Sequence, residues 1–214
     1  LIAWEVTRSC NLACVHCRAS AKYGPYPGEL SLEICYQLLD DIASFSNPIM
    51  ILTGGEPLMR KDIFEIASYG NQKGLRMVMA PNGTLITKEI ARKMKEAGIA
   101  RVSISLDGAS AETHDRFRQV SGAFEGALRG IGFLKEAGIE FQINTTITQA
   151  NIHEIEDIQK LALELGAVAH HPFLLVPTGR AADLKGLEIS PQAYEETLHW
   201  FCQRREEIPM QIKV

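Results

Sequence analysis

Three cysteines lie within eight residues near the start of the chain: Cys10, Cys14 and Cys17. Three residues separate the first pair and two separate the second, so a short loop can turn all three thiolates toward one point. A structural zinc ion takes four ligands in a closed tetrahedron, whereas a [4Fe-4S] cluster has four irons that thiolates normally hold. No fourth cysteine lies nearby, so the loop predicts a cluster with one iron open to bind and activate another molecule. A zinc loop is the alternative.

A glycine pair follows the next apolar run of the chain. Residues 49–52 are expected to form a strand buried on both faces, and they lead into the sequence TGGEP at 53–57. Gly54 and Gly55 allow the backbone to approach a ligand closely, and the carboxylate of Glu56 suits an ammonium group. A plain turn between a strand and a helix is the alternative for this segment.

Together the two segments resemble the signatures of the radical S-adenosylmethionine (SAM) enzymes. Residues 10–17 match the family's CxxxCxxC and residues 53–57 match its GGEP, although His16 stands where the family usually has an aromatic residue. The resemblance implies that the three cysteines hold the cluster and that the GGE segment receives the amino group of SAM. It also places His16 among the cofactor-binding residues.

Polar side chains on two later strands extend this assignment. Ser105 and Asp107 alternate with apolar residues on the strand expected over 101–108, and Asn144 does so on the strand expected over 140–148. Buried polar groups are costly unless they find partners. The resemblance implies that SAM is the partner, through its ribose and carboxylate for Ser105 and Asp107 and through its adenosine for Asn144. Turn chemistry at the end of the strand is the alternative for Asp107.

Two further residues complete the predicted cofactor site. Asn82 lies in the turn after the strand expected over 76–80. Arg118 closes a segment that resembles the family's HDxxR run, and a guanidinium can grip a carboxylate at two points. A solvated surface arginine is the alternative for Arg118. No side chain is assigned as a catalytic acid or base.

The resemblance also implies the chemistry. The open iron binds the amino and carboxylate groups of SAM, one electron from the reduced cluster enters the sulfonium, and the C–S bond breaks. The resulting 5′-deoxyadenosyl radical takes a hydrogen atom from an unreactive carbon, while the protein holds, orients and shields the reactants. An electron donor such as ferredoxin or flavodoxin is therefore expected as a partner. The alternative from a different class is a non-catalytic scaffold or carrier for an Fe-S cluster.

The expected substrate follows from the branch of the family that the chain resembles. Residues 3–7, 109–115, 141–146 and 173–180 are similar to the members that act in haem and haem d1 biosynthesis. This implies a tetrapyrrole whose peripheral side chains are removed or oxidised. The alternative is the group of SPASM-type peptide maturases, which add a C-terminal domain with auxiliary Fe-S clusters. The cysteines of such a domain would lie beyond residue 214.

Cationic or polar residues are expected at the entrance to a tetrapyrrole site. Arg180 follows the strand expected over 169–176, and with Arg118 it is predicted to hold a carboxylate on the rim of the macrocycle. His170 and His171 are adjacent, so they point to opposite sides of the strand and at most one faces the interior.

The elements that must position these residues alternate along the chain. Apolar spacing predicts six strand–helix units, with Ser31 and Thr87 as helix N-caps, and hence one α/β domain with a parallel sheet. Six units fall short of the eight of a full barrel, and the resemblance implies an open, TIM-like (β/α)6 barrel. We expect the barrel to span 1–208 and a C-terminal extension to begin at 209–214.

Composition sets the remaining limits. The chain has 214 residues, of which 46% are hydrophobic and 22% charged, as is ordinary for a globular protein. Its net charge of −4 gives no sign of nucleic-acid binding, and no apolar run is long enough to cross a membrane. Cys35 and Cys202, the two cysteines outside the cluster, are predicted to be structural. A low-potential cluster needs a reducing compartment, so we expect the cytoplasm.

Overall fold

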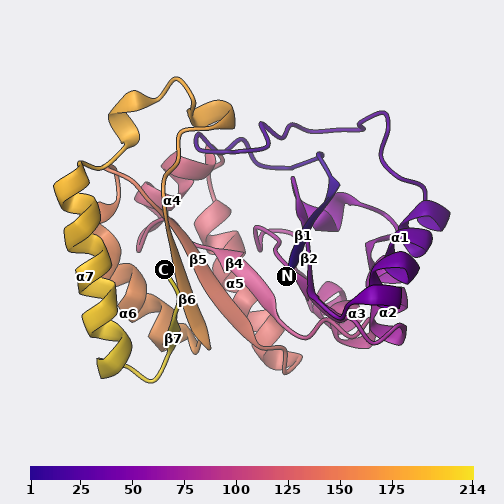
Figure 1. Cartoon of the computed structure of the whole chain (residues 1–214). Coiled ribbons are helices and arrows are strands. Elements are labelled where there is room, and N and C mark those ends of the chain that lie inside the picture. The colour runs from indigo at the N-terminus through magenta and orange to yellow at the C-terminus, as the bar shows by residue number, and fades with distance from the viewer.

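The sheet contains seven parallel strands whose order in space is their order in the chain (Figure 1). The computed structural model describes residues 1–214 apart from the side chain of Lys185. The strands are β1 (Ile2–Thr7), β2 (Ile49–Gly54), β3 (Arg76–Met79), β4 (Val102–Ser105), β5 (Phe141–Ile147), β6 (Ala169–Leu174) and β7 (Gln211–Ile212). This succession confirms the predicted open α/β barrel. The short β7 pairs with β6 and follows the six predicted strand–helix units, where the sequence of 210–214 also indicates the start of a strand; the division at residue 208 stays a prediction.

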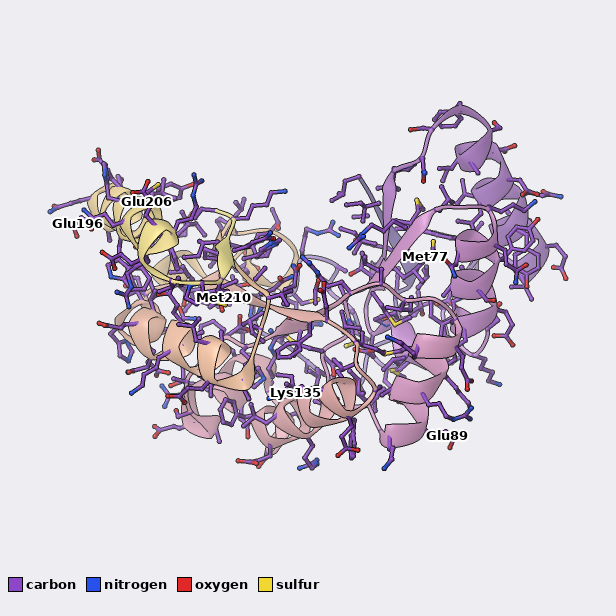
Figure 2. The ribbon with its side chains drawn as sticks, turned by 90° about the horizontal axis from the view of Figure 1, so that it is seen from below. Met77, Glu89, Lys135, Glu196, Glu206 and Met210 are labelled. Atoms are coloured by element: carbon purple, nitrogen blue, oxygen red, sulfur yellow. The ribbon has the colours of Figure 1, made fainter. Side chains whose placement is uncertain are left out.

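Helices connect the strands and lie along the outer face of the curved sheet (Figure 1). The α-helices are α1 (Leu32–Phe45), α2 (Ile63–Gln72), α3 (Lys88–Glu96), α4 (Ala111–Arg118), α5 (Ala123–Glu136), α6 (Ile155–Leu165) and α7 (Pro191–Glu207). Short 3-10 turns are η1 (Pro57–Met59), η2 (Ile152–Glu154), η3 (Gly179–Ala181) and η4 (Lys185–Leu187). Seen from below, the elements form an open arc, with Met77 on one arm and Met210 on the other (Figure 2).

None of the helices in the described part of the chain combines the length and the apolar character that a membrane crossing requires.

Side-chain caps fix where several helices begin. Ser31 and Thr87 accept hydrogen bonds from backbone N–H groups in the first turns of α1 and α3, as predicted. Ser110 caps α4 in the same way, but this helix was not predicted. The sequence signal for α4 is weak because half of its eight residues are charged and the helix carries no continuous apolar stripe. The omission matters, because Arg118 is the last residue of α4.

The alternation predicted for the fourth strand is confirmed. Val102, Ile104 and Leu106 are fully buried in the main core between the sheet and the helices. Ser105, on the opposite face, lines a cavity on the inner side of the sheet. The helices on the outer face thus keep the core dry and leave the inner face for polar contacts.

The two cysteines outside the loop differ in burial. Cys35 is fully buried in the main core, which confirms its predicted structural role. Cys202 lies exposed on α7, so the prediction of a structural role for it is wrong. The helical spacing could not reveal this, because α7 is mostly polar and its buried contacts come from other positions such as Thr197 and Phe201.

Helix α5 packs closely against the turn that follows β3. A Cβ atom on Gly130 would lie 2.4 Å from the carbonyl oxygen of Gly83, and one on Gly126 would lie 3.2 Å from Thr84. These two glycines lie one helical turn apart on the same face. Their missing side chains let α5 hold the turn after β3, where Asn82 lies, against the barrel.

We expect Gly130→Ala to lower the free energy of unfolding by about 1–3 kcal/mol, since the added methyl group meets a backbone atom that cannot move alone. Gly132 is the matched control, because it lies exposed on the same helix and a Cβ atom added there would have nothing within 4 Å. Gly132→Ala should raise the free energy of unfolding by up to about 1 kcal/mol through helix propensity. Urea unfolding of both variants measures the difference, and equal stability of the two would contradict close packing at Gly130.

Candidate cluster and cofactor site

The predicted site residues gather around one cavity at the carboxyl ends of the strands. Its volume is about 500 Å³, within the range of small-molecule sites. Ten of the twelve predicted residues line it: Cys10, Cys14, His16, Cys17, Gly54, Gly55, Asn82, Ser105, Arg118 and Asn144. The two that do not, Glu56 and Asp107, are fully buried behind its wall.

The cysteine loop is held by backbone hydrogen bonds to distant parts of the chain. Cys10 N donates to the carbonyl oxygen of Lys22 at 2.9 Å. Farther along the loop, Ala13 N and Val15 N donate to the last carbonyls of α4, those of Arg118 at 3.2 Å and Phe117 at 2.9 Å. The C-terminal end of α4 therefore docks on the loop and fixes its path.

The three thiols fit an iron–sulfur cluster. Cys10 and Cys14 are buried, Cys17 is partly buried, and all three line the cavity. Among the described residues, no three Cys, His, Asp or Glu side chains converge closely enough to hold a single metal ion. A [4Fe-4S] cluster does not require such convergence, because each thiolate binds a different iron.

Burial makes the Cys10 thiol hard to ionise. It raises the pKa of the Cys10 thiol to about 11, and the nearby carboxylate of Glu56 adds to the effect, while a hydrogen bond from the backbone of Leu12 opposes it. Metal ligands must be thiolates, so the cluster's own positive iron ions have to displace the protons. A positive side chain close to the loop assists the same step, and Arg118 is in that position, with Nη1 3.5 Å from Cys14 Sγ.

The glycine pair joins the end of β2 to the end of β1. Gly55 N donates to the carbonyl oxygen of Thr7 at 2.8 Å, and Gly54 has a φ of +138°. A Cβ atom on Gly54 would lie 2.1 Å from that oxygen, and one on Gly55 would lie 2.3 Å from the carbonyl oxygen of Ser9. The close approach of the two strands therefore already requires glycine at both positions, before any contact with a ligand is considered. A side chain at Gly55 would strike the backbone that leads into the cysteine loop.

Glu56 makes different contacts from those we expected. Its carboxylate is fully buried and accepts hydrogen bonds from Leu58 N at 3.0 Å and from Asn82 N at 2.7 Å. Burial raises its pKa to about 7, against the lowering effect of these two bonds. Instead of facing an ammonium group in the cavity, the carboxylate ties the end of β2 to the turn after β3.

Asn82 links that turn to the cysteine loop. Its Nδ2 donates to Asn11 Oδ1 at 2.8 Å, and its Oδ1 accepts from the backbone N and the hydroxyl of Thr84 at 2.9 and 2.7 Å. Asn11 Nδ2 in turn donates to Thr84 Oγ1 at 2.9 Å. Asn11 and Thr84 were not predicted, and the position of Asn11 inside the loop is the signal that could have identified it.

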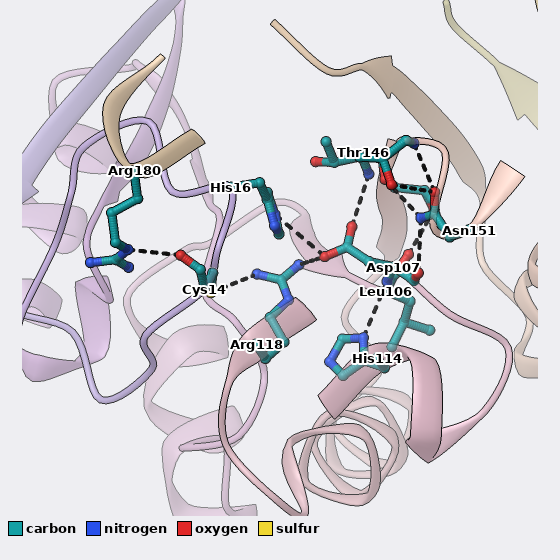
Figure 3. A network of polar contacts seen from close by, with 11 residues as sticks. Cys14, His16, Leu106, Asp107, His114, Arg118, Thr146, Asn151 and Arg180 are labelled. Atoms are coloured by element: carbon teal, nitrogen blue, oxygen red, sulfur yellow. Dashed lines mark hydrogen bonds and ion pairs between the residues drawn. The ribbon is translucent and has the colours of Figure 1, made fainter. Parts of the chain in front are cut away.

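A buried ion pair joins Arg118, which lines the cavity, to Asp107 behind it (Figure 3). Arg118 Nη2 is 2.6 Å from Asp107 Oδ2, and His16 Nε2 is 3.5 Å from the same oxygen. Burial alone would raise the pKa of Asp107, but the charge of Arg118, together with the nearby histidines and the hydrogen bond from Thr146 N, lowers it by more, so the net direction is downward. Arg118 is only 7% exposed, so the alternative of a solvated surface arginine is wrong. Asp107 contacts Arg118 rather than the cavity.

The rest of the HDxxR-like segment supports this pair. Asp107 N donates to His114 Nδ1 at 3.1 Å, which fixes the backbone next to the carboxylate. The two oxygens of Asp115 accept from Gly122 N and Phe124 N at 2.7 and 2.8 Å, where α5 begins. His114 therefore holds the backbone of Asp107, Asp115 fixes the start of α5, and Arg118 faces the cysteine loop.

The two histidines of β6 point to opposite sides, as predicted. His170 is 1% exposed and lies edge-on against Phe201 of α7, in the outer layer. His171 Nδ1 lies 3.0 Å from Gln142 Nε2, which also donates to Asn144 Oδ1 at 3.0 Å. His171 is therefore the histidine on the inner face, next to a residue that lines the cavity.

Arg180 is bound to the cysteine loop. Its Nε donates to the carbonyl oxygen of Cys14 at 2.8 Å, a second guanidinium nitrogen donates to the carbonyl oxygen of Ala21, and its backbone N donates to that of Cys17 at 3.0 Å. Arg180 also lines the cavity, but Nε and one terminal nitrogen already bind the loop, so the predicted contact with a substrate carboxylate would fall to the remaining N–H groups and stays a prediction. The sequence could not reveal the contact, since 166 residues separate Arg180 from Cys14.

Comparison with known proteins agrees with this geometry. A family model for the radical SAM superfamily matches residues 4–162. The AdoMet-dependent heme synthase of Nitratidesulfovibrio vulgaris is 58% identical over 213 residues, which cover 100% of this chain and 58% of that protein. The mycofactocin maturase MftC of Mycolicibacterium smegmatis is 35% identical over 209 residues, which cover 97% of this chain and 53% of that protein.

A solved structure shares the fold. Streptococcus suis SuiB bound to S-adenosylmethionine has a TM-score of 0.79 with 13% identity, over 99% of this chain and 49% of that one. The chain spans little more than half the length of the curated relatives named above. Since the family model matches most of the chain and a relative is 58% identical over all of it, the chain belongs to the radical SAM superfamily.

Proposed function

We propose that this chain is the catalytic core of a radical SAM enzyme, with Cys10, Cys14 and Cys17 holding a [4Fe-4S] cluster and the adjoining cavity binding SAM. The observation that carries the proposal is that the cysteine loop and the glycine pair line one cavity at the carboxyl ends of the strands. When bound, the two cofactors supply a 5′-deoxyadenosyl radical that removes a hydrogen atom from the substrate.

The chain's own residues bind and orient. Ser105 and Asn144 offer hydroxyl and amide groups on the inner face of β4 and β5, next to each other in register. Arg118 and the glycines Gly54 and Gly55 line the cavity beside the cysteines. These positions suit the ribose, adenine and amino acid parts of SAM. An electron donor of the ferredoxin or flavodoxin kind and a cytoplasmic location belong to the same proposal.

The substrate we propose is a tetrapyrrole whose carboxylate-bearing side chains are removed or oxidised. The heme synthase relative is 58% identical to the chain and the peptide maturase 35%, which favours the first. The mouth of the cavity also suits a flat apolar ring, because Phe173 and Val176 line it and are 51% and 70% exposed. This apolar lip was not predicted; Phe173 lies near the end of β6 and Val176 lies two residues after the strand.

Cys14→Ala should abolish both the iron of the site and the cleavage of SAM, because a cluster cannot be held stably by two thiolates. Iron per chain and 5′-deoxyadenosine released with dithionite are the measurements. Cys202→Ala is the matched control, since Cys202 is exposed on α7, and it should match the wild type. A Cys14→Ala protein that keeps four irons and cleaves SAM would show that the cluster lies elsewhere. A wild-type protein that holds a cluster but releases no 5′-deoxyadenosine would be a scaffold or carrier.

Arg180→Ala should loosen the cluster by removing two hydrogen bonds to the carbonyls of the loop. We expect iron to pass to a chelator several-fold faster than from the wild type, followed by the loss of cluster absorbance. Arg205→Ala, an exposed change on α7, is the control and should leave the rate unchanged. If the rate of iron loss is unchanged and the KM for a tetrapyrrole is raised, Arg180 contacts the substrate, as first predicted, and does not hold the cluster loop.

The substrate class can be tested directly. Sirohaem-derived porphyrins and a panel of leader peptides are added separately to the reduced enzyme with SAM, and products are identified by mass spectrometry. We expect loss or oxidation of a side chain on the porphyrin. Modified peptide without any tetrapyrrole turnover would establish the peptide maturase function instead.

A further inference from the structure

Each sulfur of the cysteine loop has one N–H donor, and one of the three donors differs from the others. Two donors are backbone amides of the loop itself: Leu12 N to Cys10 Sγ and Ala21 N to Cys17 Sγ, each at 3.4 Å. The third sulfur, Cys14 Sγ, lies 3.5 Å from Nη1 of Arg118. Backbone amides are neutral dipoles, whereas the guanidinium carries a full positive charge. The loop therefore has one sulfur beside a cation.

The guanidinium is fixed in this position. Asp107 Oδ2 lies 2.6 Å from Arg118 Nη2, on the side away from Cys14 (Figure 3). Asp107 is itself immobile, because its Oδ1 accepts from Thr146 N at 2.8 Å and its carbonyl oxygen accepts from Asn151 Nδ2 at 2.9 Å. Strand β5 and the turn after it thus hold the carboxylate, the carboxylate holds the guanidinium, and the guanidinium faces the sulfur.

Burial strengthens the effect of this charge. Arg118 is 7% exposed, Asp107 is fully buried and Cys14 is 8% exposed. Little water is present at such buried sites to screen charges. A cation a few ångströms from a sulfur therefore acts on it more strongly than at the surface. The charge and the hydrogen bonds around the sulfurs are among the factors that set the reduction potential of an iron–sulfur cluster.

We propose that Arg118, positioned by Asp107, raises the reduction potential of the cluster bound by the three cysteines. The inference rests on the proposed function, since it requires that cluster. Reduction adds one electron from an external one-electron donor to the cluster and breaks no bond, so the cluster becomes more negative by one charge. A fixed positive charge beside Cys14 stabilises this more negative form. The carboxylate of Asp107 lies on the far side of the guanidinium from the sulfur, so its negative charge offsets only part of the effect.

The test is a redox titration of the anaerobically reconstituted protein without SAM, with the electron paramagnetic resonance signal of the reduced cluster as the readout. Arg118→Gln removes the charge, and we expect the ratio of reduced to oxidised cluster at the wild-type midpoint to fall roughly tenfold, the size of one charge-assisted hydrogen bond. Arg118→Lys keeps the charge and should recover most of the wild-type value. Arg116→Gln, on the exposed face of the same helix, is the control and should shift nothing.

Asp107→Asn gives an independent arm that leaves Arg118 itself unchanged. The amide keeps the shape of the carboxylate and one acceptor oxygen, but the offsetting negative charge is gone, so the midpoint should rise above that of the wild type. If Arg118→Gln fails to hold a cluster, this arm decides. Midpoints of Arg118→Gln equal to the wild type at full iron content, or a midpoint of Asp107→Asn that is unchanged or lower, would overturn the inference. A wild-type protein without any cluster signal would instead overturn the proposed function.

Discussion

Bringing three sulfur ligands together in a buried loop costs electrostatic free energy, and much of the structure around the cavity serves to offset that cost. The burial that raises the pKa of Cys10 also opposes any negative charge on the loop. Each sulfur has one N–H donor that offsets this cost, and the donor at Cys14 belongs to a buried cation. The loop is short enough to supply two of these donors itself, but the cation has to come from a different part of the fold.

The site is therefore complete only when distant parts of the chain have come together. The end of β2 closes on the end of β1 through the glycine pair, and the end of α4 docks on the middle of the loop. Arg180, after β6, then binds the loop carbonyls from the far side of the arc. Each of these contacts fixes the path of the cysteine loop, so the loop's shape depends on strands and helices from across the barrel.

Much of the fold and the identity of the site could be predicted from the sequence, because both depend on local patterns. The cysteine spacing and the glycine pair after an apolar run both identified residues that line the cavity. The same holds for Ser105 and Asn144, which alternate with apolar residues along their strands. The individual roles could not be predicted in the same way. Whether Glu56 faces a ligand or caps a turn, and whether Arg180 faces a substrate or a loop, depends on contacts between residues far apart in the chain. Helix α4 was missed because its few apolar residues form no stripe.

The buried pair of Asp107 and Arg118 is best understood through position rather than stability. A buried ion pair repays the free energy of desolvation poorly, and apolar residues of similar volume often serve a fold equally well. Here β5 holds the carboxylate of Asp107, and His114 and Asn151 hold its backbone, which is more support than a pair serving only stability requires. The arrangement is explained if its role is to hold a positive charge beside one sulfur. His16 adds to the same cluster of contacts, because its Nε2 lies 3.5 Å from the carboxylate oxygen that faces Arg118.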